Sequence, residues 1–348
     1  MDDQRSPTNG PRLRRATLSD VAARAGVSAV TASRALRRPE MVSADLRQRV
    51  ARAVEALDYI PNQLASALAS ARTGTIGVLI PSLTNGVFAD YLRALHDALL
   101  PAGFQVMVFN SRYLPDEEEK AISAMLGQHP EAMILAGIEQ SDHARRALQL
   151  AEIPVVQTME LTSDPIDINI GFSQRAAGYA ATRHLLDLGL RRVGHISARL
   201  DARARRRMEG YRQAMEEAGL DPTTDVAATT QHSTFALGAR LFNELLAHTP
   251  DLEAIFACND DLALGALFEC HRRGLRVPHD MSIIGFNDLE ICASCFPSLS
   301  SVATPRYEMG RQAAAIVTRI TRGDGERPEN PVIDLGFEIR ARDSTSRR

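Results

Sequence analysis

The sequence lacks the features that mark membrane and secreted proteins. It has no run of about 18 apolar residues, so a transmembrane helix is not expected. Its first fifteen residues are polar and contain no apolar segment typical of a secretory signal. Of its 348 residues, 45% are hydrophobic and 24% are charged, as in globular domains. We therefore expect a cytoplasmic protein with no membrane contact and about two or three domains.

Motifs for catalysis and metal binding are also missing. No G-x-G-x-x-G follows the first predicted strand, and no P-loop, G-x-S-x-G or H-E-x-x-H occurs. Of the four cysteines, Cys292 and Cys295 form a single C-x-x-C, whereas zinc prefers four ligands. We interpret the cysteines as buried or incidental thiols in a reducing compartment. We expect no catalytic activity, no metal and no cofactor.

Positive charge is unevenly distributed along the chain. Residues 1–73 hold 12 arginines against 7 acidic residues, whereas the remainder holds 28 basic and 36 acidic residues. The excess at the N-terminus indicates that only this part of the chain meets a polyanion such as DNA.

From Thr75 onward, apolar strands alternate with amphipathic helices, which predicts an α/β body with parallel sheets. Ligands of such folds bind in a crevice at the carboxyl ends of the strands. The predicted strands are 76–81, 104–110, 132–137, 153–159, 192–197, 254–259, 282–286 and 301–305.

The stretch TLSDVAARAGVSAVTASRAL, from Thr17, predicts two short helices joined by a tight turn. Thr17 and Asp20 can form a capping box, Gly26 can end the first helix, and Ser28 can cap the second. A third helix then repeats four apolar residues at helical spacing, namely Leu46, Val50, Val54 and Leu57. This pattern predicts an all-α headpiece with a helix-turn-helix motif. A helical cap that binds nothing is the alternative, but it does not account for the excess of positive charge at the N-terminus.

The same stretch and the following VSADLRQRVARAVEALDYIPNQLASALAS resemble the headpiece and hinge of the lactose-repressor (LacI/GalR) family. The resemblance runs from Thr17 to about Arg342. It implies a periplasmic-binding-protein-like body with two doubly wound subdomains, and a homodimer on a pseudo-palindromic operator. The C-terminal tail has no leucine heptads, so we expect no tetramerising coiled coil.

The expected organisation follows from these patterns and from the resemblance. It comprises a disordered tail (1–15), a headpiece (16–61), a hinge helix and linker (62–74), and an effector-binding core (75–343) whose N-subdomain takes 75–172 and 303–325 and whose C-subdomain takes 173–302 and 326–343.

The resemblance assigns DNA contacts to the second helix. Ala29 and Val30 occupy the two main base-reading positions; they cannot hydrogen-bond through their side chains, but they can contact thymine methyl groups. Arg34 is then the strongest candidate for a bidentate contact to guanine. We expect the small residues of this helix to let it lie deep against the bases. The other expected contacts are Thr31 and Ser33 on the same helix and, mainly at phosphates, Thr17, Ser28, Ser33 and Asn62.

The hinge segment NQLASALAS, from Asn62, is about nine residues long and too short to be a stable helix alone. The resemblance implies that it orders when two copies meet in the minor groove, where Leu68 wedges between base pairs. A linker residue that packs on its own core is the alternative for Leu68.

Longer matches in the body, such as IGVLIPSLTNGVFADYLRAL and IFACNDDLALGALFECHRRGLRVPHDM, resemble the gluconate-utilisation repressors of this family. They imply a sugar acid effector: gluconate, a phosphorylated or keto derivative, or a lactone. The arginine-rich stretch ARLDARARRRMEGYR agrees, because a carboxylate accepts hydrogen bonds from a guanidinium fork. Asp201 can cap a helix there that carries Arg203 and Arg207 on one face. Arg207 aligns with the family's effector-binding arginine and is our first candidate, with Arg203 second; most of the other arginines fit a solvated face.

Three further residues are expected at the effector site. Phe88 matches the aromatic that lines the family's sugar site, although core packing would also account for it. Asn259 and Asn287 each follow a predicted strand, where an α/β crevice places polar groups. Many family members carry aspartate at the position of Asn287. Asparagine keeps hydrogen bonds for hydroxyls and removes a negative charge, which favours an anionic ligand.

The sequence thus predicts a DNA-binding repressor of genes for sugar acid uptake or catabolism, released from its operator by the effector. Within this class, a 2-ketogluconate sensor or another sugar-responsive regulator is the alternative, and the effector could instead strengthen DNA binding. A sugar-binding transport protein is the alternative from another class, against which the basic headpiece counts.

Overall fold

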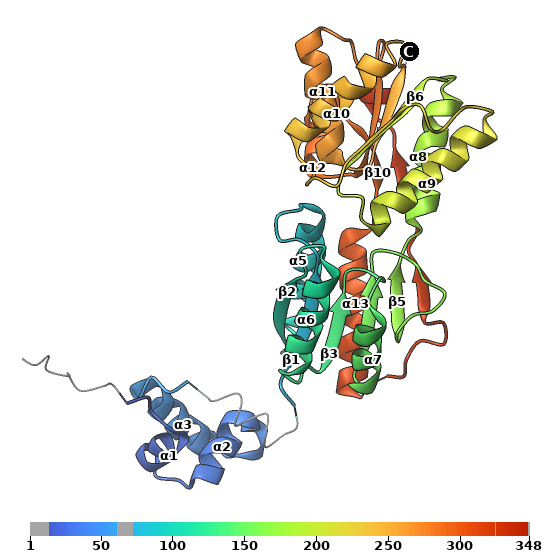
Figure 1. The fold of residues 1–348 in the computed structure, drawn as a ribbon. Coiled ribbons are helices and arrows are strands. Elements are labelled where there is room, and N and C mark those ends of the chain that lie inside the picture. The colour runs from blue at the N-terminus through green and yellow to red at the C-terminus, as the bar shows by residue number, and fades with distance from the viewer. Residues whose placement is uncertain (1–13, 61–71, 324, 347–348) are drawn as a thin grey trace, which may run out of the picture. The chain divides into compact units, whose positions relative to one another are not determined.

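The computed structural model describes residues 14–60, 72–323 and 325–346. The chain forms two compact units, Met1–Thr73 and Gly74–Arg348, called here the headpiece and the body (Figure 1). Asn62, Leu68 and most of the predicted disordered tail lie outside the described residues. None of the described helices combines the length and the apolar composition that a bilayer-spanning segment needs.

The headpiece has the predicted helices and caps. Thr17 and Asp20 form the capping box of the first helix, with the Thr17 backbone N–H donating to the Asp20 carboxylate at 2.8 Å. Gly26 ends this helix with φ 64°, a left-handed conformation that costs glycine little. Ser28 caps the second helix by accepting from the Thr31 backbone N–H at 3.1 Å. The elements are α1 (Leu18–Ala25), α2 (Ala29–Arg37), the 3-10 turn η1 (Pro39–Met41) and α3 (Ala44–Ala56).

A small apolar core holds these three helices together. Val50 is buried at its centre, and the other apolar residues predicted on α3 pack around it. Ala32 and Ala35 of α2 are also buried. Ala32 and Ala35 therefore serve packing inside the headpiece, which leaves the other small residues of α2 for the expected close approach to the bases.

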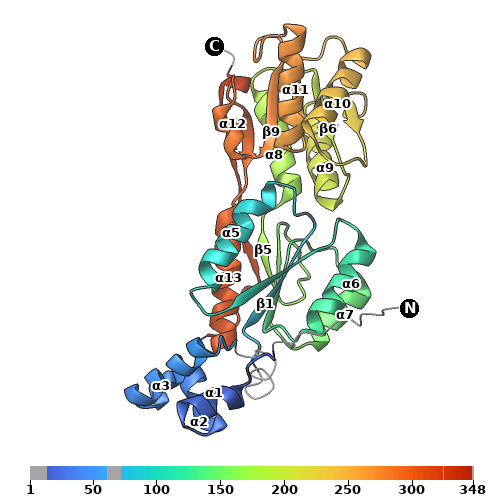
Figure 2. The same ribbon diagram turned by 90° about the vertical axis from the view of Figure 1, so that its left-hand side faces the viewer.

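The body contains two six-stranded sheets, and this confirms the prediction of two parallel α/β units (Figure 2). All strand pairs are parallel except β10 with β12, which is antiparallel. The first sheet has the order β11 (Val332–Asp334), β5 (Ile168–Gly171), β4 (Val155–Thr158), β3 (Ala132–Leu135), β1 (Thr75–Ile80) and β2 (Gln105–Asn110). The second has the order β12 (Glu338–Arg340), β10 (Ser300–Ala303), β9 (Ser282–Asn287), β8 (Ala254–Ala257), β6 (Val193–Ser197) and β7 (Val226–Ala228).

Helices cover both faces of each sheet, and each sheet with its helices is called a lobe below. In the first lobe α5 lies beside α13 on one face and α6 beside α7 on the other (Figure 2). In the second lobe α8 pairs with α9 and α10 with α11 (Figure 1). The helices are α5 (Val87–Leu99), α6 (Pro115–Leu126), α7 (Asp142–Leu150), α13 (Arg306–Arg322), α8 (Gln174–Asp187), α9 (Ala202–Glu217), α10 (Phe235–His248), α11 (Asp260–Arg273), the short α12 (Glu290–Ser294) and the 3-10 turn η2 (Asp343–Thr345).

Four short strands were not predicted: β5, β7, β11 and β12. One of them corrects the expected division of the body. We had assigned 326–343 to the C-subdomain, but Val332–Asp334 pairs with β5 in the first sheet. After α13 the chain therefore stays in the first lobe through β11 before β12 joins the second sheet. Strands of three or four residues carry too little periodicity to be recognised in the sequence.

A histidine is buried within the second sheet. The ring of His195 on β6 contacts the rings of Tyr211 and Phe256, at centroid distances of 5.1 and 4.9 Å. Its Nδ1 lies 2.9 Å from the Phe256 carbonyl oxygen, while Nε2 is buried without a partner among the described residues. Burial lowers the pKa of His195 to about 3.

His195 should make the fold sensitive to acid. Below pH 6.5 the unfolded chain protonates this histidine and the folded chain does not, so stability falls as the pH falls. Between pH 7 and pH 5 this single group should remove roughly 2 kcal/mol from the free energy of unfolding. Urea denaturation at the two pH values should show a smaller loss in His195→Gln. His143→Gln, which changes an exposed histidine, should keep the wild-type loss. Equal losses in all three proteins would contradict this role.

Candidate functional sites

The outward face of α2 carries the residues predicted to read DNA. Ala29, Val30 and Arg34 are exposed, and the Val30 side chain is 68% accessible, which is unusual for valine. Thr31 and Ser33 are half-buried beside them. An exposed apolar side chain next to a guanidinium suits a surface that meets both thymine methyl groups and guanine edges.

Two of the predicted phosphate contacts are engaged in helix caps. The Thr17 hydroxyl donates to the Asp20 carboxylate at 2.7 Å, and the Ser28 and Thr31 hydroxyls lie 2.8 Å apart. Both caps are exposed. A phosphate here would meet hydroxyl groups and helix N-termini whose orientation is already fixed.

The second site is a cleft between the two lobes of the body, called here the effector cleft. Its walls enclose about 450 Å³, a volume that includes the part open to solvent. All five residues predicted at the effector site line it: Phe88, Arg203, Arg207, Asn259 and Asn287.

Arg207 is the buried cation of the cleft. Its Nε donates to Gln174 Oε1 at 2.7 Å, its Nη1 donates to the Cys258 carbonyl oxygen at 2.5 Å, and its guanidinium carbon lies 3.8 Å from the centroid of the Phe286 ring. All these partners are neutral, and no carboxylate of the described residues lies within ion-pair distance. Nη2 has no hydrogen-bond partner in the same part of the chain. Burial lowers the pKa of Arg207 to about 10, so it remains a cation at neutral pH.

Close packing of two helices positions Arg207. A Cβ on Gly178 of α8 would lie 2.3 Å from the Arg207 carbonyl oxygen, and a Cβ on Gly210 of α9 would lie 2.1 Å from the Arg175 carbonyl oxygen. The two glycines therefore allow the helix backbones to approach closely. Asp201 caps α9 as predicted, accepting from the Ala204 backbone N–H at 2.8 Å.

Arg203, one turn earlier on α9, differs from Arg207 because it is already neutralised. It forms an ion pair with Asp201 at 3.3 Å, and its guanidinium carbon lies 5.7 Å from the ring centroids of Phe88 and Tyr113. Burial lowers the pKa of Arg203, but Asp201, together with Tyr113 and Glu139, more than compensates, so the pKa is raised. Arg203 thus joins the first-lobe aromatics to the second lobe and is less available to a ligand anion.

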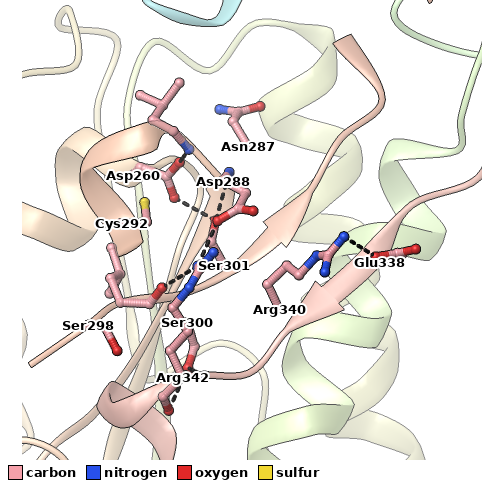
Figure 3. A network of polar contacts seen from close by, with 12 residues as sticks. Asp260, Asn287, Asp288, Cys292, Ser298, Ser300, Ser301, Glu338, Arg340 and Arg342 are labelled. Atoms are coloured by element: carbon pink, nitrogen blue, oxygen red, sulfur yellow. Dashed lines mark hydrogen bonds and ion pairs between the residues drawn. The ribbon is translucent and has the colours of Figure 1, made fainter. Parts of the chain in front are cut away.

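The two predicted asparagines contribute in different ways. Asn259 caps α11, and its Oδ1 accepts from the Leu262 backbone N–H at 3.0 Å and from the Ser233 hydroxyl at 2.9 Å. Only its amide N–H groups remain for a ligand. The Asn287 side chain has no hydrogen-bond partner among the described residues and lies apart from the polar network behind it (Figure 3).

That network explains why the residue after Asn259 does not face the ligand. Asp260 is fully buried and accepts from the Ser301 hydroxyl at 2.6 Å and from the Leu289 backbone N–H at 2.9 Å (Figure 3). Burial raises the pKa of Asp260 to about 6. Its role is to hold the turn that follows β9.

The sequence reasoning missed several lining residues: Asn85, Tyr113, Arg199 and Ser233. Tyr113 follows strand β2 closely, so the rule used for Asn259 and Asn287 could have found it. The guanidinium carbon of Arg199, in the second lobe, lies 4.0 Å from the ring centroid of Tyr113, in the first lobe. The backbone of Arg199 is left-handed, with φ 67°, and no sequence pattern predicts this conformation for an arginine.

Arg206 does not lie on a solvated face but links the two lobes. From α9 it forms ion pairs with Glu139 at 2.6 Å and with Glu160 at 3.3 Å, both in the first lobe. The four cysteines are free thiols, and within residues 14–60, 72–323 and 325–346 no group of acidic, histidine or cysteine side chains could hold a metal ion.

Comparison with known proteins identifies the family to which the headpiece and the body belong. Residues 17–62 match the model of bacterial regulatory proteins of the lacI family, and residues 182–345 match that of periplasmic binding protein-like domains. The HTH-type transcriptional regulator GntR of Pseudomonas aeruginosa is 43% identical over 345 residues, which are 99% of this chain and 98% of that protein. The chain belongs to the lacI family of bacterial regulatory proteins.

Solved structures of this family share the architecture. A LacI-family regulator from Silicibacter pomeroyi is 35% identical, with a TM-score of 0.89 over 95% of this chain and all of that one. The lac repressor dimer bound to operator and an anti-inducer is 25% identical, with a TM-score of 0.81 over 95% of this chain and 99% of that one. The predicted fold class is confirmed: a lacI-type helix-turn-helix headpiece with a periplasmic-binding-protein-like body. The protein is a transcriptional regulator.

The exposed face of α2 leads to a test on this lacI-family regulator. Arg34→Ala should relax the preference for one base pair in each half-site and cost about 1–3 kcal/mol there, because the predicted bidentate contact to guanine would be lost. Selection of binding sites from random DNA, followed by titration at fixed salt, measures this preference. Arg52→Ala, which removes an exposed arginine from α3, is the matched control and should leave the base preference unchanged. An unaltered preference in Arg34→Ala would contradict the assignment.

Proposed function

We propose that this lacI-family regulator represses genes for uptake or catabolism of a sugar acid, with gluconate as the leading candidate. Binding of the acid in the effector cleft releases the protein from its operator. The observation that carries the proposal is the buried, unneutralised guanidinium of Arg207. A cation in this position is costly unless a negative charge joins it, and a ligand carboxylate can supply that charge.

The remaining lining fits the polyol part of such a ligand. Asn85, Asn259 and Asn287 present side-chain amides, and Ser233 presents a hydroxyl. Phe88 and Tyr113 add apolar surface for the C–H face of the carbon chain. The 43% identity to GntR over nearly the whole chain supports the resemblance to the gluconate-utilisation repressors.

The proposed DNA complex is a cytoplasmic homodimer on a pseudo-palindromic operator. Two copies of α2 would enter successive major grooves, about 34–36 Å apart. The similarity to the operator-bound lac repressor dimer supports this arrangement. The roles proposed for Asn62 and Leu68, at a phosphate and in the minor groove, come from the family resemblance.

Arg207→Ala should separate effector binding from DNA binding. Removing one partner of a buried charge pair costs about 2–5 kcal/mol, so the gluconate concentration needed for release should rise at least roughly 30-fold. Fluorescence anisotropy with labelled operator, titrated with gluconate, measures both steps. Operator affinity without gluconate should stay at the wild-type value, since the headpiece is a separate unit.

The matched control is Arg205→Ala, which removes an exposed arginine two residues away on α9. It should be released by gluconate like the wild type. Normal release of Arg207→Ala would refute the proposed ligand contact, and gluconate-strengthened operator binding by the wild type would reverse the proposed direction of control.

A further inference from the structure

The turn after β9 holds two consecutive residues in an uncommon conformation. Asn287 has φ 110° and Asp288 has φ 55°, and neither is glycine. Backbones of this kind persist only where surrounding groups fix them. Because Asn287 lines the effector cleft, whatever fixes this turn also fixes the position of a cleft side chain.

On the side of the second lobe, the turn is fixed by the network in Figure 3. The Asp288 backbone N–H donates to the Ser301 hydroxyl at 3.0 Å, and the Asp288 carboxylate accepts from Arg342 at 2.6 Å. The Leu289 backbone N–H donates to Asp260. These bonds all come from the lobe that carries the turn.

The carbonyl oxygens of the turn are held from the first lobe. Arg306, the first residue of α13, donates through Nη1 to the Asn287 carbonyl oxygen and through Nη2 to the Asp288 carbonyl oxygen at 3.3 Å. Arg306 stands where the chain crosses from β10 of the second lobe to α13 of the first. Only 8% of the residue is exposed.

The guanidinium is anchored by α5. Arg306 Nη2 lies 3.2 Å from Asp90 Oδ2, and Asp90 is two residues after Phe88 on the wall of the cleft. Arg306 Nε is buried without a partner among the described residues. One N–H group of the Arg306 guanidinium thus has no hydrogen bond among the described residues. Asp90 and the two carbonyl oxygens determine the position of the guanidinium.

We propose that Arg306 is a positioning residue that couples the ligand to the arrangement of the lobes. It holds the Asn287 turn to the first lobe. Ligand contact at Asn287 is therefore coupled to movement of one lobe against the other. Arg306 touches no ligand itself. The proposal rests on the proposed function for the identity of the ligand, but the grip on the turn does not depend on it.

The test uses the full chain with Arg306→Lys and Asp90→Asn. The single nitrogen of a lysine ammonium cannot reproduce the two nitrogens through which the guanidinium fork reaches both carbonyl oxygens and Asp90, and asparagine removes the anchoring charge. The first readout is the ratio of operator dissociation constants with and without saturating gluconate. We expect this ratio to fall at least ten-fold in Arg306→Lys and less in Asp90→Asn, with operator affinity in the absence of gluconate unchanged. Arg93→Ala is the control, because Arg93 is exposed and also pairs with Asp90, at 2.8 Å, but does not reach the turn.

The second readout is amide hydrogen exchange without ligand. The Asp288 and Leu289 amides should exchange at least ten-fold faster in Arg306→Lys and at the wild-type rate in Arg93→Ala. Wild-type exchange in Arg306→Lys, or an unchanged operator ratio in both Arg306→Lys and Asp90→Asn, would overturn the proposal. If gluconate does not change operator binding by the wild-type protein, the proposed function is refuted. The role of Arg306 in holding the turn is still tested by the exchange measurement.

Discussion

The body depends on one buried guanidinium that has no counter-ion. Arg207 is held by a glutamine, a backbone carbonyl and an aromatic ring, all of them neutral. The close approach of α8 and α9 at Gly178 and Gly210 sets its position. A desolvated charge without an anion beside it costs stability, because transfer out of water is unfavourable for an ion. A ligand carboxylate would remove this cost only when it lies in the cleft, which gives the protein a physical basis for preferring an acid to a neutral sugar.

Contacts of two arginines that do not line the effector cleft also join the lobes. Arg206 reaches Glu139 and Glu160 of the first lobe, while Arg306 reaches from the first lobe to the turn that carries Asn287. The residues proposed to contact the ligand and the residues that join the lobes thus share α9 and the turn at the end of β9. A ligand shifts a conformational equilibrium only as far as its affinities for the two states differ. Contacts that change when the lobes move are where such a difference can arise.

Much of this organisation could be predicted from the sequence, because capping residues and strand–helix alternation are local signals. Thr17, Gly26 and Ser28 predict where the headpiece helices begin and end. The position of Asn259 and Asn287 after apolar strands predicts that both line the cleft. Other features depend on tertiary structure. No local pattern distinguishes Arg207 from Arg203, since the difference is the ion pair of Arg203 with Asp201. The left-handed Arg199 and the place of Val332–Asp334 in the first sheet likewise depend on contacts distant in sequence.

The most direct test of the central claim is calorimetric titration of the full-length protein with gluconate, 2-ketogluconate, 6-phosphogluconate and neutral glucose. If an unneutralised Arg207 selects the ligand, at least one of the acids binds with a dissociation constant at least roughly 100-fold lower than that of glucose, as expected for a buried charge pair worth several kcal/mol. Glucose binding as tightly as every acid would contradict the account, because no ligand charge would then be needed in the cleft.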